Sequence, residues 1–311
     1  MARRKRRKYG GRDISGIVLL DKPAGMTSNA ALQQVKQLFN AGKAGHTGSL
    51  DPLATGMLPV CFGEGTKVSP FLLDADKTYR LVARLGVRTS TGDSEGEVIE
   101  RRQAQVPSAA RLEQVLQRFR GEIEQVPPMY SALKHNGERL YKLARQGVEV
   151  ERKPRKVMIH HLALLSAEAD TLTLEVKCSK GTYIRTLAED IGEALGCGAH
   201  VSQLRRLQVG VFTDPQQMYS LPALQQLAEQ GYPALDQCLF AVEQALSDWP
   251  EVVLPQDSAY YLAQGQAVLA AHAPTSGLVR LVAENSGFFG MGQILEDGRV
   301  APKRLFNAGK C

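Results

Sequence analysis

The sequence predicts an α+β protein in which a large mixed α/β domain precedes a smaller β-rich domain. Residues 79–86 and 171–178 alternate apolar and polar side chains, as half-buried strands do. Residues 28–39 and 108–121 instead repeat apolar side chains at helical spacing. Beyond residue 250 the chain turns into short β-type runs, and a length of 311 residues suits one large and one small domain. We therefore place a domain boundary near residue 250.

The first part of the chain is expected to frame one loop. The apolar run Gly16–Leu20 predicts a buried strand, and Thr27 or Ser28 can cap the helix that follows it. Residues 44–59, AGHTGSLDPLATGMLP, have poor helical periodicity, and their glycines and prolines predict a shaped loop. An aspartate before a proline, as at Asp51, is by itself most often a turn former.

A strand, a helix and a basic segment are expected next. Tyr79 lies at the start of the alternating strand, and the turn-rich residues 89–97 lead into a further strand. Ser108 is expected to cap a helix that Gly121 ends. Residues 134–156 then carry eight Lys or Arg against three acids. This segment is either a solvated surface excursion or a lobe that closes on a polyanion such as RNA.

The alternating strand 171–178 is followed by a turn and a helix. The turn at 179–181 brings Tyr183 and Arg185 to the junction between strand and helix, and Gly196 is expected to end that helix. Side chains at such junctions often point into a cleft, although in an arbitrary protein they are more often structural.

The last part of the large domain reads as two helices, 221–230 and 234–246. The small domain then contains runs from Leu278 and Phe288 that are typical of strands, and Asp297–Gly298 predicts a turn before a last strand.

Composition is typical of a soluble globular protein, and the charge of the N-terminal segment leaves two interpretations open. Hydrophobic residues make up 43% of the chain and charged residues 23%, and no apolar run approaches the roughly 18 residues of a membrane span. Residues 1–12, MARRKRRKYGGR, carry seven Arg or Lys and no acid, with no signal-peptide core after them. With a net charge of +6, this basic arm is either a solvated tail or a phosphate-seeking one.

The residue pattern predicts no metal and no nucleotide cofactor. The five cysteines are odd in number and form no CxxC pair, so we expect free thiols in a reducing cytoplasm. His160 and His161 would face opposite sides of a strand and could not chelate one ion together. A phosphate-loop motif, GxGxxG, HExxH and GxSxG are all missing.

Several segments of the sequence resemble the motifs of one family nearly residue for residue. They are GIVLLDKPAGMTSN, GHTGSLDPLATGMLPV, DKTYRLVARLG, PPMYSALKHNGERLYKLARQG, CSKGTYIRTLAEDIGEALGCGAHV and LRRL, in this order along most of the chain. They are similar to the TruB family of tRNA pseudouridine synthases. The resemblance implies a catalytic domain at 13–250 built on a central, mainly antiparallel sheet, with an RNA-binding insertion at about 127–156. Residues 251–311 would form a small PUA-like RNA-binding domain.

The resemblance also implies the reaction. Uracil leaves C1′ of its ribose, rotates and reattaches through C5, with no cofactor and with the target base flipped out of its stack. The substrate would be the uridine at position 55 in the T arm of tRNA. We expect a cytoplasmic enzyme that works as a monomer.

By resemblance, Asp51 is the essential carboxylate, and Arg185 is the cation that keeps it ionised and oriented through a planar fork. Tyr79 would stack on the flipped uracil, and Tyr183 would contact the base or remove the C5 proton.

Three further residues complete the predicted site. His46 would fill the space that the base vacates or brace the loop, and Leu204 would line the pocket. Lys22 is a candidate for supporting the loop. Taken alone, His46 would more often be an ordinary loop histidine, and Lys22 a surface charge.

Two other interpretations stay open. A noncatalytic RNA-binding or RNA-folding protein would carry the same basic segments, although Asp51 is present. A guide-RNA-dependent member of the same superfamily would work within a multiprotein particle, but the chain lacks the long charged tails of eukaryotic members. Activity on tRNA with no other component separates the three.

Overall fold

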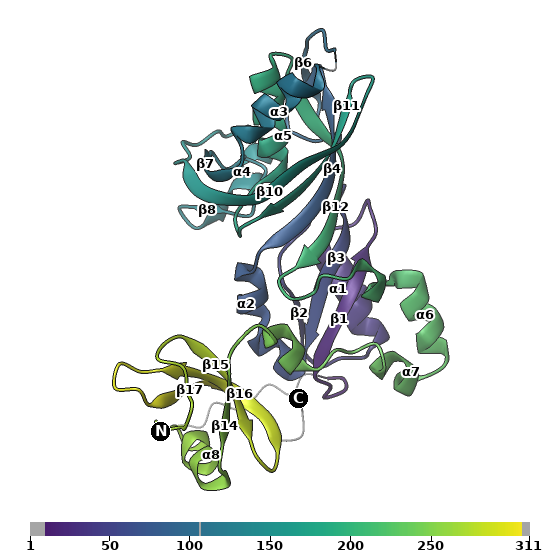
Figure 1. Ribbon diagram of the computed structural model, residues 1–311. Helices are drawn as coiled ribbons and strands as arrows, with labels where there is room; N and C mark the ends of the chain where they lie inside the picture. The colour runs from purple at the N-terminus through teal and green to yellow at the C-terminus, as the bar shows by residue number, and fades with distance from the viewer. Residues whose placement is uncertain (1–9, 106, 307–311) are drawn as a thin grey trace.

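The computed structural model describes residues 10–105 and 107–306, so most of the basic arm at 1–12 and Cys311 lie outside the described residues. The α+β prediction is confirmed: one long sheet runs through the large domain and a small sheet forms the C-terminal domain (Figure 1). No helix within the described ranges is long and apolar enough to cross a membrane.

The long sheet has nine strands among the described residues, in the order β13-β1-β3-β12-β4-β11-β10-β7, with β2 paired to β3. Only the pairs β1–β13 and β3–β12 are parallel, so the sheet is mainly antiparallel. Its strands are β1 Gly16–Lys22, β2 Ala44–His46, β3 Thr55–Phe62, β4 Lys77–Leu85, β7 Gly121–Gln125, β10 Arg155–Glu168, β11 Thr171–Cys178, β12 Ala199–Val209 and β13 Tyr219–Ser220.

The structure confirms the predicted strands and helices on either side of the segment that carries Asp51 and of Arg185. Strands β1, β4 and β11 lie where alternation or an apolar run predicts them. Helix α1 (Ser28–Leu38) begins after Thr27, whose hydroxyl accepts a hydrogen bond from Ala30 N. Helix α5 (Ile184–Leu195) ends at Gly196, which has the left-handed φ of 87° that a glycine cap permits.

Segment 44–59 is not one loop, and this prediction is wrong at both ends. Its first residues form β2, and its last residues belong to β3, where Met57 and Leu58 are completely buried. A strand that is buried on both faces has no alternation, so its apolar run is hard to distinguish from a loop rich in small residues. The true loop is residues 47–54, and it carries Asp51.

Two helix boundaries are also corrected. Helix α3 (Ala109–Gln117) is capped by Ser108 but stops four residues before Gly121, which begins β7. The predicted helix 234–246 divides into α7 (Tyr232–Asp236) and a 3₁₀ turn, Val242–Leu246. The backbone between them is extended because Phe240 exchanges two hydrogen bonds with Ile17 of β1.

His160 and His161 lie at an irregularity of β10. The register of β10 against β11 shifts between Ile159 and His161, and both histidines are exposed. Among the described residues, no group of three or more His, Cys, Asp or Glu could hold a metal ion.

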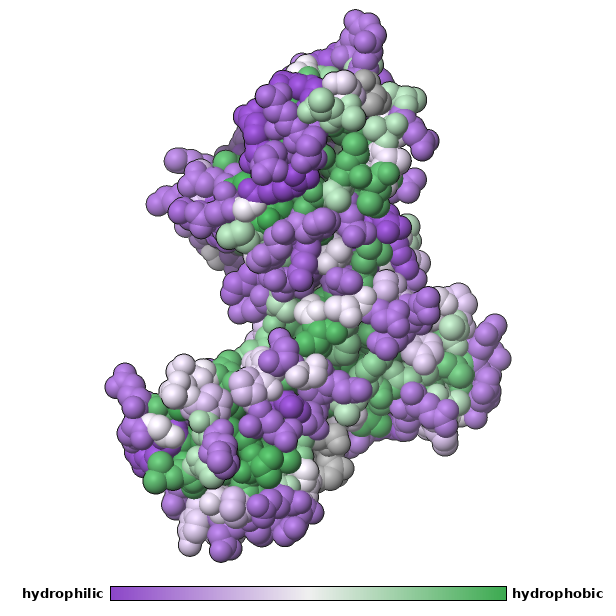
Figure 2. All heavy atoms as spheres, in the orientation of Figure 1, coloured by the Kyte–Doolittle hydropathy of each residue, from purple (hydrophilic) through white to green (hydrophobic). Residues whose placement is uncertain are grey.

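The segment predicted as a basic lobe forms a hairpin and a short helix beside β7 and β10. Its elements are β8 Lys134–His135, β9 Glu138–Arg139 and α4 Leu140–Arg145. A second hairpin, β5 Val87–Thr89 with β6 Val98–Arg101, extends from the same end of the molecule. Figure 2 shows hydrophilic side chains gathered over this end.

The C-terminal sheet has the order β14-β15-β16-β17, with bounds Glu251–Leu254, Leu278–Ala283, Gly287–Ile294 and Val300–Leu305. Helix α8 (Gln256–Ala263) packs on it and was not predicted. Met291 and Phe306 of this domain pack in one cluster with Val68 and Leu246 of the large domain. The remaining elements are the 3₁₀ turns Gly63–Lys67 and Pro215–Gln217, α2 Ser69–Asp74 and α6 Leu221–Glu229.

Candidate active site

Asp51 and Arg185 lie in direct contact although 134 residues separate them. Arg185 Nε lies 2.9 Å from Asp51 Oδ2, and Arg185 Nη2 donates to Asp51 Oδ1 at 3.3 Å. This is the two-point geometry of a guanidinium fork on a carboxylate. The Arg185 side chain is 6% exposed, whereas that of Asp51 is 40% exposed. The carboxylate is therefore held from behind and open on one side.

Backbone from two other segments fixes the Arg185 guanidinium. Its Nη1 donates to Thr91 O at 2.7 Å, and its Nη2 donates to Tyr130 O at 2.8 Å. Asp93 Oδ2 lies 3.6 Å from Nη1, so a second carboxylate shares the cation. The β5–β6 connection and the segment just before β8 thus meet at the Arg185 side chain.

Asp51 does not have the low pKa of an ordinary ion pair. Desolvation by the surrounding protein raises the pKa of Asp51, Arg185 opposes this rise, and the charge of Asp93 adds to it. Arg185 offsets part of the cost of burial and sets the orientation of the carboxylate.

Lys22 supports the loop from its far side. It is completely buried, and its Nζ donates to Pro23 O, Met26 O and Pro52 O at 2.8, 2.7 and 3.3 Å. Burial lowers its pKa to about 8, while the nearby charge of Asp51 favours the protonated form. Because one of its acceptors directly follows Asp51 in the chain, Lys22 lies where a loop-supporting residue is expected.

Tyr79 and Leu204 belong to one apolar cluster with residues of the loop. Both side chains are nearly buried, at 9% and 8% exposed, and they share this cluster with Leu50 and Ala54. Strand β4 supplies the tyrosine and strand β12 the leucine. The structure therefore brings the predicted aromatic and pocket-lining residues to the loop that carries Asp51.

Tyr183 lies at the N-cap of α5, two residues before Arg185. Its backbone N–H donates to Gln125 Oε1 at 3.0 Å, and Gln125 Nε2 donates back to Tyr183 O at 3.2 Å. The side chain is half-buried, and burial raises the pKa of the phenol, with Asp51 close enough to add to the rise.

His46 is the predicted residue with the weakest link to the site. It ends β2 and pairs with Val60. Its Nδ1 is buried without a hydrogen-bond partner among the described residues, and burial together with the charge of Arg206 lowers its pKa.

Sequence reasoning missed four residues that complete the site: Asp93, Gln125, Ser28 and Arg206. Ser28 Oγ accepts from Leu50 N at 2.7 Å and donates to Leu50 O at 3.1 Å, which ties the loop to α1. Asp93 stands in a stretch read only as a turn, and Ser28 was read only as a helix cap. Single polar residues of this kind show their partners only after folding.

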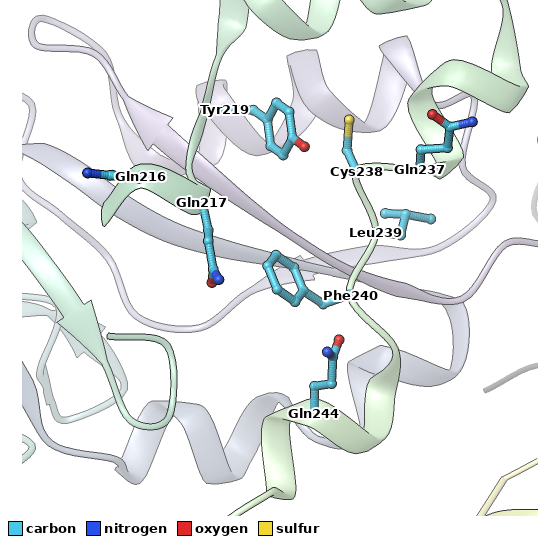
Figure 3. A pocket seen from close by; sticks show the side chains of 8 residues that line it. All are labelled: Gln216, Gln217, Tyr219, Gln237, Cys238, Leu239, Phe240 and Gln244. Atoms are coloured by element: carbon cyan, nitrogen blue, oxygen red, sulfur yellow. The ribbon is translucent and has the colours of Figure 1, made fainter. Parts of the chain in front are cut away.

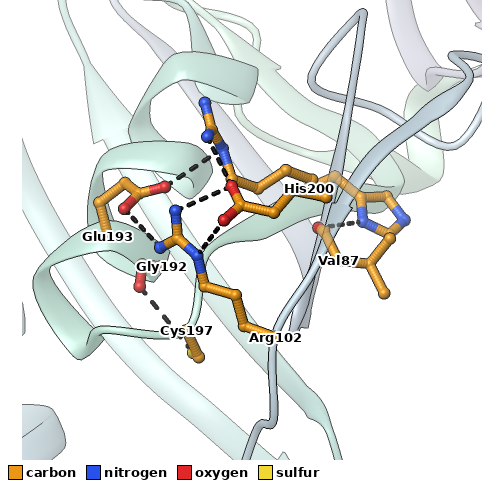
Figure 4. Close-up of polar contacts among 8 residues, drawn as sticks. Val87, Arg102, Gly192, Glu193, Cys197 and His200 are labelled. Atoms are coloured by element: carbon orange, nitrogen blue, oxygen red, sulfur yellow. Dashed lines mark hydrogen bonds and ion pairs between the residues drawn. The ribbon is translucent and has the colours of Figure 1, made fainter.

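A cluster of ion pairs holds the β5–β6 hairpin against α5 (Figure 4). Arg88 and Arg102 each contact Glu100 and Glu193, at distances of 2.7–3.1 Å. The same hairpin carries Thr91 and Asp93, so this cluster fixes the backbone that holds Arg185.

A pocket of about 450 Å³ opens elsewhere, between β13 and the segment 237–244 (Figure 3). Its lining consists of Tyr219, Cys238, Leu239, Phe240 and four glutamines. None of the predicted site residues lines it.

Comparison with known proteins assigns the chain to a family. The model of the TruB family pseudouridylate synthase N-terminal domain matches residues 36–184, and two TruB C-terminal models match 185–247 and 250–306. The tRNA pseudouridine synthase B of Nitrosococcus oceani is 58% identical over 97% of this chain and 98% of its own length. That of Stutzerimonas stutzeri is 58% identical over 96% and 97%.

Among solved structures, a chain of a Cbf5-Nop10-Gar1 complex superposes with a TM-score of 0.74 and 27% identity. The match covers 94% of this chain and 85% of that one. The chain therefore belongs to the TruB family of pseudouridylate synthases, which are isomerases.

Proposed function

We propose that this protein converts the uridine at position 55 in the T arm of tRNA into pseudouridine, with Asp51 as the catalytic carboxylate. The observation that carries the proposal is the Asp51–Arg185 pair, in which a carboxylate is gripped at two points yet keeps an open face. The names of the curated relatives support tRNA as the substrate. The T-arm position rests on the resemblance of the sequence motifs.

The reaction breaks the bond from C1′ to N1 and forms one from C1′ to C5, so no atom is gained or lost. An ionised Asp51 can act as a nucleophile or stabilise positive charge on the sugar while the base is detached. Arg185 would direct one carboxylate edge toward the substrate, and Lys22 would keep the loop backbone in place. Tyr79 and Leu204 pack with loop residues in one apolar cluster, which would limit the access of water from that side.

Tyr183 would contact the base and take part in removing the C5 proton. Because burial raises its pKa, the phenol is protonated near neutral pH. A neutral phenol accepts a proton well only while it passes its own proton on, so we propose that Tyr183 acts as a relay to water and not as a phenolate.

The proposal extends to the parts of the chain. Residues 13–250 would form the catalytic domain, the insertion at about 127–156 would close on RNA, and residues 251–311 would add a PUA-like RNA contact. Tyr130 O on Arg185 supports a link between the insertion and the site. We further propose that the enzyme is cytoplasmic and works as a monomer without a guide RNA. The higher identity to single synthases than to the Cbf5 chain supports the last point.

The test compares Asp51→Asn with the wild type on T-arm tRNA and no other component. The amide keeps the size of the side chain but removes its charge, so we expect pseudouridine formation to fall by several powers of ten while tRNA affinity stays within a few-fold. An appreciable rate in the variant would refute the role of Asp51. Wild-type protein that binds tRNA without modifying it would favour the noncatalytic alternative.

A further inference from the structure

Arg206 is a buried charge with no carboxylate beside it. Its side chain is 1% exposed, and it makes no ion pair within the described part of the chain. Its Nε donates to Met57 O at 2.7 Å and its Nη2 to Gly48 O at 3.1 Å. Removing a guanidinium from water is costly, and here carbonyl dipoles replace the usual anion.

The position of Arg206 in the sheet relates it to both sides of the site. In β12 it lies directly opposite Tyr79 of β4 on one side and Gly56 of β3 on the other. Its two carbonyl acceptors belong to the chain on either side of Asp51, at Gly48 and Met57. One side chain therefore spans the base of the catalytic loop.

The Arg206 and Tyr79 side chains lie on the same face of the sheet, because the two residues are directly opposite each other in paired strands. Burial raises the pKa of the Tyr79 phenol, and the charge of Arg206 opposes this rise. Tyr79 is 9% exposed, so most of its ring lies inside the protein beside the Arg206 guanidinium. If the ring served only as an apolar platform, a phenylalanine would serve as well. The hydroxyl adds a polar group on which the charge of Arg206 acts.

We propose that Arg206 is a positioning residue for the isomerisation: it sets the Tyr79 ring and the Asp51 loop relative to each other through its place beside the Tyr79 side chain and its hydrogen bonds to the carbonyls of Gly48 and Met57. The inference rests on the proposed function, in which Tyr79 stacks on the flipped base. Reacting groups held to within about 0.5 Å account for much of the rate of an enzyme, and a displacement of 1 Å costs about 10²-fold.

The test is a double-mutant cycle of Arg206→Lys and Tyr79→Phe, read as the single-turnover rate at saturating tRNA. Lysine keeps the charge but lacks a planar fork that can reach both carbonyls while it lies against Tyr79. We expect each single variant to slow the reaction about tenfold, and the double variant to be no slower than the slower single variant. tRNA affinity should stay within threefold.

The control is Lys77→Met. Lys77 is a neighbouring buried cation, but its Nζ donates to Leu72 O, Leu73 O and Ala75 O at the end of α2. Its loss should lower the melting temperature and leave the saturated rate within threefold. A purely structural Arg206 would behave in the same way as this control.

Each outcome of the double-mutant cycle either supports or overturns the positioning role of Arg206. Tyr79→Phe at the wild-type rate overturns the inference, as do losses that multiply in the double variant. Should Arg206→Lys fail to fold, a slowed Tyr79→Phe with normal affinity and melting temperature supports it. Failure of the proposed function is distinct, because the wild type itself would then form no pseudouridine at the T-arm position.

Discussion

Arg185→Lys separates the charge of the arginine from its shape. The arginine makes two contacts with Asp51 and one with each of two carbonyls, from a side chain that is 6% exposed. A lysine ammonium can satisfy at most three acceptors around one point, so at least one buried acceptor loses its partner, at a cost of about 1–3 kcal/mol. Because Asp51 would also turn away from its productive orientation, we expect the single-turnover rate to fall about 10²-fold.

The assay is pseudouridine formation at saturating tRNA, with tRNA affinity and thermal unfolding measured on the same samples. The matched control is Arg205→Lys, because Arg205 grips Asp21 at two points, at 2.9 and 2.8 Å, on a more exposed part of β12. Exposed pairs contribute about 0–1 kcal/mol, so this control should keep its rate within threefold. The reasoning is refuted if Arg185→Lys is as active as Arg205→Lys.

Three further predictions concern the backbone at Gly56, the pH dependence set by Asp51, and the basic residues at 153–156. Gly56 has a φ of 97°, and an added Cβ would lie 2.2 Å from Arg206 O, so Gly56→Ala should lower the free energy of unfolding by about 2–5 kcal/mol. Gly45→Ala, where nothing lies within 4 Å, should change the unfolding midpoint in urea by far less. Since the pKa of Asp51 is raised, the acid side of the pH–rate profile should show activity being lost at a pH above 3.8. Asp93→Asn removes a negative charge near Asp51, so this loss should move to lower pH. A loss of activity that stays at the same pH, or moves to higher pH, contradicts the assignment. Neutralising three exposed cations together should flatten the slope of log affinity against log salt by about two to three units without changing the saturated rate. These cations are Lys153, Arg155 and Lys156, the last of which already contacts Glu122 at 2.8 Å. An unchanged slope would remove the lobe from the binding surface.

Strands with one buried face and capped helices could be predicted from the sequence, because their signal is local. In β4 the buried Leu81 and the exposed Arg80 alternate as the pleat requires. Strand β12 was missed because its buried and half-buried positions do not alternate cleanly, and two register shifts interrupt its pairing with β4. The extended backbone at Phe240 depends on Ile17, which lies more than two hundred residues away in the chain.

The predicted site shows the same division between local and long-range signals. Asp51 and Arg185 were recognised from motifs, and the structure places them in contact. The role of Asp93 could not be seen, because a carboxylate in a glycine-rich turn looks like any other turn residue. Its effect on the pKa of Asp51 exists only once the hairpin has folded over α5.

The contacts of the buried cations were the hardest feature to predict, and the reason is chemical. Lys22 and Arg206 have backbone carbonyls as their hydrogen-bond acceptors, so no acidic residue in the sequence marks their partners. Every residue carries such a carbonyl, and the pattern of side chains therefore holds no trace of the contact. Both cations lie under the loop that carries Asp51, where their charges are kept out of solvent. Because these cations hold the loop through its backbone carbonyls, the Asp51 carboxylate stays free to meet the substrate. A loop held by ion pairs to its own carboxylate would lose that freedom.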